Sequence, residues 1–155
     1  MKTQILASAL ALTLLISCNK KDDNKRPIDT AAPEATAMVN SKSCYQYASD
    51  KDTVSMTLAM SANNANGELI YKLAEKDRNT GTFSGTFIGD TLFADYTFDS
   101  EGTSSVREAV FLKSGDKLIE GNGEMEERSN KMCFKNPKKI SFDSATIVLV
   151  KEDCR

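Results

Sequence analysis

The strongest constraint on the fold is an alternation of apolar and polar residues with a period of two. It is clearest at Val54, Met56, Leu58 and Met60, which are separated by Ser, Thr and Ala. Successive side chains of a β-strand point to opposite faces, so this pattern predicts strands that are buried on one side. The same pattern recurs at Leu69, Tyr71 and Leu73, at Phe83, Gly85 and Phe87, at Leu92, Ala94, Tyr96 and Phe98, and at Ile147 and Leu149.

Short polar or glycine-containing segments separate the predicted strands. Residues 89–90 (Gly-Asp) fit a two-residue hairpin turn, and residues 63–67, 99–102 and 114–116 have turn-forming compositions. No helical pattern of ten residues lies between the strands. The sequence therefore predicts an all-β fold, a small antiparallel up-and-down barrel of lipocalin-like type with about 7–8 strands. A β-sandwich is the alternative.

Two regions are harder to assign. In residues 106–112, Arg107 lies on the face of Ala109 and Phe111, whereas Glu108 lies on the face of Val106, Val110 and Leu112, so each face carries one charge. Residues 124–139 are rich in Glu, Lys and Asn and show no alternation. We predict a long loop there, with room for one helical turn.

The first residues have a different character. Lys2 precedes a run from Ile5 to Ile16 that carries no charge, which is typical of a secretory signal peptide. The run is too short to cross about 30 Å of hydrocarbon as a helix. The composition then changes to Lys, Asp, Ala, Thr and Pro, which is typical of a flexible tether. We therefore predict a signal peptide (1–17), a tether that begins at Cys18 (18–43) and a β-barrel domain (44–155).

The end of the signal peptide resembles a known motif. Leu15-Ile16-Ser17-Cys18 resembles the lipobox of bacterial lipoproteins, and the Lys- and Asp-rich segment 19–25 resembles the surface-export signal of Bacteroidetes-type lipoproteins. In that family the peptide is cut before the Cys, and the thiol carries a diacylglycerol. The resemblance implies a lipid on Cys18 and a protein of the outer membrane that faces outside, with a periplasm-facing anchor as the alternative. Two or more acyl chains hold a protein stably on a membrane.

A second resemblance lies within the domain. A Gly89-Asp90 turn is followed by an aromatic strand, a Ser100–Gly102 turn and a later Glu120-Gly121-x-Gly123. This set is similar to a family of Bacteroidetes-type lipoproteins with a small β-barrel domain and no established activity. The resemblance implies class and location, and it assigns no chemistry.

Composition excludes several functions. The chain has no His, so it cannot build a Ser-His-Asp or Cys-His catalytic centre or a His-ligated metal site. It carries 20 Lys and Arg against 22 Asp and Glu, which disfavours nucleic acid because nucleic-acid binding needs a basic patch. We expect no cofactor, no metal and no catalysis, with a carboxylate-based hydrolase as the alternative.

The cysteines suggest one disulfide. Export implies an oxidising compartment, and lipidation of Cys18 leaves an odd number, Cys44, Cys133 and Cys154. The first and last strands of a closed meander are neighbours, so we predict a Cys44–Cys154 bridge. A Cys133–Cys154 bridge is the alternative.

Four charged residues lie inside the predicted strands and suggest a site: Asp95, Arg107, Glu108 and Glu120. We single out Glu101, Arg107 and Glu120 as a candidate polar pocket or ion-pair cluster. Arg107 would hold a ligand carboxylate, and Glu101 or Glu120 would orient the guanidinium. A solvated outer face or a buried ion pair is the alternative interpretation.

These features predict a binding protein. The ligand would be a small apolar molecule or a protein partner, and the alternative is a protein-inhibitor or envelope-interaction module that resembles lysozyme inhibitors at the level of the fold. A pocket that reaches the barrel centre would favour a small ligand. A filled barrel with a protruding segment at 124–139 would favour a protein partner.

Overall fold

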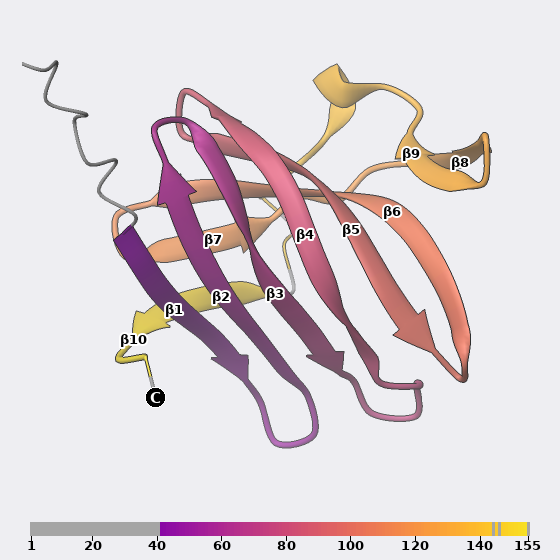
Figure 1. The fold of residues 1–155 in the computed structure, drawn as a ribbon, viewed down its shortest axis with the longest axis horizontal. Coiled ribbons are helices and arrows are strands. Elements are labelled where there is room, and N and C mark those ends of the chain that lie inside the picture. The colour runs from indigo at the N-terminus through magenta and orange to yellow at the C-terminus, as the bar shows by residue number, and fades with distance from the viewer. Residues whose placement is uncertain (1–40, 144, 146, 155) are drawn as a thin grey trace, which may run out of the picture. The chain divides into compact units, whose positions relative to one another are not determined.

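The computed structural model describes residues 41–143, 145 and 147–154, and this part of the chain consists of strands and one short 3₁₀ helix (Figure 1). No helix within it is long and apolar enough to span a membrane. The predicted signal peptide, Cys18 and the predicted tether up to residue 40 lie outside the described residues. The elements are β1 (Ser41–Ala48), β2 (Thr53–Ser61), β3 (Asn64–Lys72), β4 (Asn79–Ile88), β5 (Thr91–Ser100), β6 (Thr103–Ser114), β7 (Lys117–Glu120), β8 (Met125–Arg128), β9 (Lys131–Phe134), η1 (Pro137–Lys139) and β10 (Val148–Glu152).

Eight of the strands form a closed antiparallel barrel. Each strand from β1 to β6 pairs with the next one along the chain, and β10 pairs with both β7 and β1. The ring therefore has no open end, and its connectivity is that of an up-and-down meander. The predicted all-β barrel is confirmed, and the sandwich alternative is excluded.

The barrel interior is filled by the apolar face of each strand. Side chains on that face meet at the centre, and nine of them are less than 2% exposed. The interior of an eight-stranded barrel is just wide enough to be filled by side chains. The nine are Tyr96, Phe111, Met56, Leu58, Leu69, Leu92, Leu118, Leu149 and Val54.

The turn between β2 and β3 is shorter than predicted. It consists of Ala62 and Asn63, and residues 64–67 belong to β3. Gly67 is required there by contact rather than by turn geometry, because a Cβ on it would lie 1.7 Å from the carbonyl oxygen of Thr57 on β2. A residue without a side chain lets the two strands approach closely at this point.

Between β7 and β10 the chain leaves the barrel in a segment that we call the excursion, residues 121–143. The predicted loop at 124–139 is in fact mostly a β-hairpin, β8–β9, which turns at Ser129 and Asn130, both with positive φ. These strands are short and charged, so they lack the alternation that would have revealed them. The predicted helical turn is η1. β9 pairs in parallel with β6 and holds the excursion against the outside of the barrel (Figure 1).

The disulfide joins the two ends of the barrel chain. Cys44 of β1 and Cys154, just after β10, are bonded with their Cα atoms 5.2 Å apart. The predicted pairing is confirmed, and Cys133 is a free, buried thiol in β9. β1, the first strand of the barrel, begins at Ser41.

Candidate functional site

Two of the three residues singled out from the sequence meet inside the barrel. Arg107 of β6 and Glu120 of β7 both lie on the inner face, with Nη2 of the arginine 3.6 Å from Oε1 of the glutamate. Glu101 does not join them. It lies exposed in the tight turn between β5 and β6, with a φ of 48°. The structure therefore reduces the predicted cluster to an ion pair.

Two tyrosines complete this inner cluster. The Tyr71 hydroxyl donates a hydrogen bond to Oε1 of Glu120 at 2.8 Å, and the Tyr96 hydroxyl donates to the carbonyl of Leu69 at 2.8 Å. The guanidinium of Arg107 lies 4.9 Å from the centre of the Tyr71 ring and 5.6 Å from that of Tyr96. Such stacking partly replaces the lost hydration of the cation. The sequence placed both tyrosines on the inner face but not beside Arg107.

Burial dominates the electrostatics of the inner cluster. It raises the pKa of Glu120, while Arg107 and the Tyr71 hydroxyl oppose the rise by stabilising the carboxylate. Burial also raises the pKa of Tyr96 to about 12, so both tyrosines stay neutral hydrogen-bond donors. The Nε of Arg107 is buried without a hydrogen-bond partner among the described residues. The cluster is thus a paired charge within a filled core rather than the floor of a pocket.

A cleft of about 300 Å³ lies on the outside of the barrel. We call it the lateral cleft. Its floor is the outer surface of β4, β5 and β6, and its far wall is the excursion. The larger apolar residues of its lining are Phe93, Val110, Phe134, Pro137 and Ile140.

Val110 shows how the excursion creates this site. It faces away from the barrel centre, yet it is only 2% exposed because the excursion covers it. Phe134 of β9 is 5% exposed, and it also belongs to this outer apolar group. The group is separate from the core inside the barrel. The outside of the barrel therefore has a second small apolar cluster next to open space.

The polar edge of the cleft is formed by two carboxylates and one ammonium. Asp95 of β5 and Glu108 of β6 are directly opposite each other in the sheet. The Nζ of Lys131 lies 2.5 Å from Oδ1 of Asp95 and 3.4 Å from Oε1 of Glu108. Burial lowers the pKa of Lys131, but hydrogen bonds and charges from the two carboxylates outweigh it and leave the pKa raised. The group carries one negative charge in excess.

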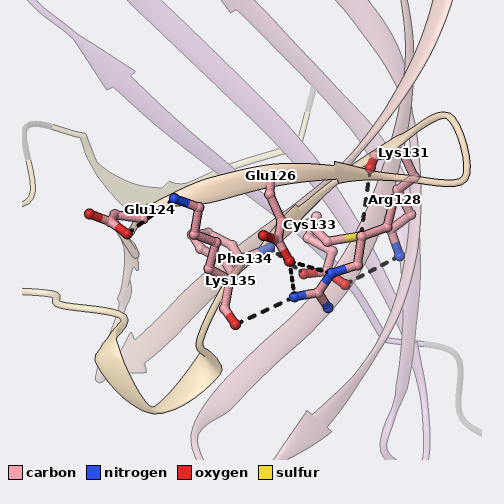
Figure 2. Close-up of polar contacts among 8 residues, drawn as sticks. Glu124, Glu126, Arg128, Lys131, Cys133, Phe134 and Lys135 are labelled. Atoms are coloured by element: carbon pink, nitrogen blue, oxygen red, sulfur yellow. Dashed lines mark hydrogen bonds and ion pairs between the residues drawn. The ribbon is translucent and has the colours of Figure 1, made fainter.

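Polar contacts fasten the wall of the cleft (Figure 2). The other carboxylate oxygen of Glu108, Oε2, accepts a hydrogen bond from the Phe134 backbone N–H at 2.8 Å, which ties β9 to β6. Within the hairpin, the Nε of Arg128 donates to Glu126 at 2.6 Å (Figure 2). Just outside it, Lys135 pairs with Glu124 at 3.4 Å. The excursion is therefore braced at several points.

The sequence contained only part of the signal for this cleft. Asp95 and Glu108 were noticed as charges inside strands, but Lys131 and Phe134 fell in the predicted loop. The apolar residues that share a face with Glu108, among them Val110, and the apolar run 132–134 within the loop were the available signals. Neither indicates by itself that the two segments meet.

The described residues offer no evident metal site, because no three His, Cys, Asp or Glu side chains among them lie close enough to hold an ion.

Comparisons of the chain with protein-family models, curated proteins and solved structures find no match. The fold and the geometry of the inner cluster and the lateral cleft are therefore the observations that bear on function.

Proposed function

We propose that this protein is a lipoprotein of the outer membrane, anchored through Cys18 and facing outside, which presents a non-catalytic barrel that binds a small ligand. The lipobox-like residues 15–18 and the charged segment after them support the anchor and the location. The oxidised Cys44–Cys154 pair agrees with an exported domain, because disulfides persist in oxidising compartments.

One observation supports a ligand site on the outer wall of the barrel. The barrel centre is occupied by side chains less than 2% exposed, whereas the lateral cleft is open and lined by apolar groups with a few polar ones. Ligand sites have this composition, and their volumes start near 300 Å³. The ligand is therefore small, and it binds on the outer wall of the barrel, not in its centre.

The arrangement of the carboxylates supports binding rather than hydrolysis. Acid–base hydrolysis needs one protonated and one ionised carboxyl group that both reach the substrate. Glu120, whose pKa is raised, faces the barrel interior, whereas Asp95 and Glu108 share Lys131 on the outside. Glu120 and the two outer carboxylates therefore lie on opposite sides of the barrel wall and cannot reach one substrate together.

The anchor is tested by fractionation. Replacement of Cys18 by Ala removes the thiol that would carry the lipid, so the variant should move from the membrane fraction to the soluble fraction. Incorporation of labelled palmitate should be lost as well. A variant that stays in the membrane fraction would contradict the anchor.

The orientation is tested on intact cells. External protease should remove the domain if it faces outside, and a periplasmic protein serves as the control for envelope integrity. Complete protection of the domain would place it on the periplasmic side.

The binding site is tested with a neutral apolar probe, 2-phenylethanol. Titration should shift the backbone amide resonances of Phe93, Ala94 and Phe134, which line the cleft, and leave those of Leu69 and Leu118 in the barrel centre unchanged. Ser84→Phe fills the cleft with a larger side chain and should abolish the shifts. Shifts confined to the barrel centre would contradict the proposed site.

One observation favours a protein partner as a second candidate. The β8–β9 hairpin stands beside the barrel, and β8 pairs on one side only, with β9 (Figure 1). A free strand edge can accept another strand. Replacement of residues 126–133 by a short glycine linker would abolish such binding. If the linker variant still bound its partner, the hairpin would not be the interface.

A further inference from the structure

We propose that the lateral cleft binds small amines, with the apolar part of the ligand against Phe134 and Ile140 and the ammonium group at Asp95. This inference rests on the proposed function, because it uses the same cleft and adds the charge of the ligand.

The charge of the cleft favours a cation. Two carboxylates share the single ammonium of Lys131, so one negative charge remains unbalanced at the polar edge. Oδ1 of Asp95 is used by Lys131, but no donor among the described residues reaches Oδ2. The Asp95 side chain is 56% exposed and therefore accessible to a ligand. An ammonium group would complete the hydrogen bonding of Asp95 and neutralise the edge.

The position of Lys131 disfavours an anion. The ammonium is held between Asp95 and Glu108, so a ligand carboxylate that approached it would also face both acidic groups. Glu108 is committed further, because it accepts the Phe134 backbone N–H. Like charges at close range are destabilising. Lys131 therefore acts as part of the acidic edge rather than as an anion site.

The shape of the cleft limits the apolar part of the ligand. Two aromatic rings, Phe93 and Phe134, and the side chains of Pro137 and Ile140 line the space next to the acidic edge. A flat ring or a short alkyl chain joined to an amine by a few bonds matches this distribution of apolar and charged groups. The volume of about 300 Å³ is at the lower end for ligand sites and excludes larger amphiphiles.

The test compares three probes of nearly the same size: 2-phenylethylamine, 2-phenylethanol and 3-phenylpropionate. Each is titrated into the lipidated, processed protein in nanodiscs of zwitterionic lipid, and empty nanodiscs are subtracted. We expect the amine to bind at least ~5-fold more tightly than the alcohol, because one partly exposed ion pair adds about this much to the affinity. The carboxylate should bind most weakly of the three. Added salt should reduce the advantage of the amine.

A matched pair of variants assigns the effect to Asp95. Asp95→Asn should lower the affinity for the amine to that for the alcohol and leave the affinity for the alcohol unchanged. Asp99→Asn is the control, because Asp99 is an exposed carboxylate on the same strand and face but does not line the cleft. It should change neither affinity. The comparison of the three probes in the unmodified protein tests the amine site even if a variant misfolds.

The outcomes separate the two proposals. Equal affinity for amine and alcohol, or tightest binding of the carboxylate, would overturn the amine site and leave a neutral ligand site in place. Failure of all three probes to shift the cleft resonances would overturn both. An equal loss of amine binding in the Asp95 and Asp99 variants would show a general effect of surface charge and overturn the assigned contact.

Discussion

At the scale of single residues, Arg107 and Glu120 are charges in a place that normally excludes them. Their side chains are 28% and 12% exposed, and each depends on the other for compensation. A buried pair adds little net stability, but removal of one partner leaves an uncompensated charge. Arg107→Met should therefore lower the free energy of unfolding by about 2–3 kcal/mol, less than for a fully buried pair because the Arg107 side chain is partly exposed.

The double variant provides the control for this prediction. Arg107→Met combined with Glu120→Gln removes both charges, so it should be more stable than Arg107→Met alone. Urea denaturation of the unmodified protein, the two single variants and the double variant measures the difference in the free energy of unfolding. Simple addition of the two single effects would contradict a coupled pair.

The pH dependence of stability has a defined sign at Glu120. Because its pKa is raised in the folded protein, the folded state holds this proton at pH values where the unfolded chain has lost it. Stability therefore decreases as pH rises from the usual carboxyl range through the raised pKa. Glu120→Gln cannot titrate, so its stability should lack this decrease. A difference between the two proteins that stays constant across the pH series would contradict the prediction.

At the scale of elements, Gly67 decides how β2 and β3 pair. A Cβ at this position would overlap the backbone of Thr57, which cannot move without breaking the ladder between the strands. Gly67→Ala should cost about 3 kcal/mol, measured from the midpoint of thermal or urea unfolding. Gly89→Asn is the control, because Gly89 has a φ of 59° and open space around it. Asn tolerates this conformation, so the cost there should stay below about 1 kcal/mol.

At the scale of the whole molecule, the disulfide joins the first and last strands of the barrel. The two cysteines are separated by 110 positions in the sequence, so the bond constrains almost the whole unfolded domain. In the chain-entropy model a loop of this length contributes about 4–5 kcal/mol. Replacement of both Cys44 and Cys154 by Ala should therefore lower the free energy of unfolding by about 4–5 kcal/mol.

Peptide mapping under non-reducing conditions checks the pairing itself. The expected fragment links the peptides of Cys44 and Cys154, and Cys133 should react with an alkylating agent only after unfolding because it is buried. Cys133→Ala should leave the linked fragment unchanged. A fragment that contains Cys133 linked to either other cysteine would contradict the structure.

The inner half of the barrel could be predicted from the sequence. Alternation with a period of two identified which side chains of β2 to β5 face inward, and Tyr71, Tyr96 and Leu92 all lie where the pattern placed them. The tight turn at residues 89–90 was also predicted, because few residues other than Gly adopt a positive φ there. The seam between the first and last strands followed from the closure of the meander. These features depend on local stereochemistry, which neighbouring residues determine.

Alternation alone determined that this chain forms strands with an apolar inner face. Only the tertiary structure decided what covers the outer face. Val110 and Phe134 come together, and Lys131 reaches Asp95 from 36 positions away, because the excursion folds back across β6. A period of two distinguishes two sides of a strand, but it contains no information about which distant segment lies against the solvent side. The lateral cleft therefore arises from a long-range contact that no local pattern encodes.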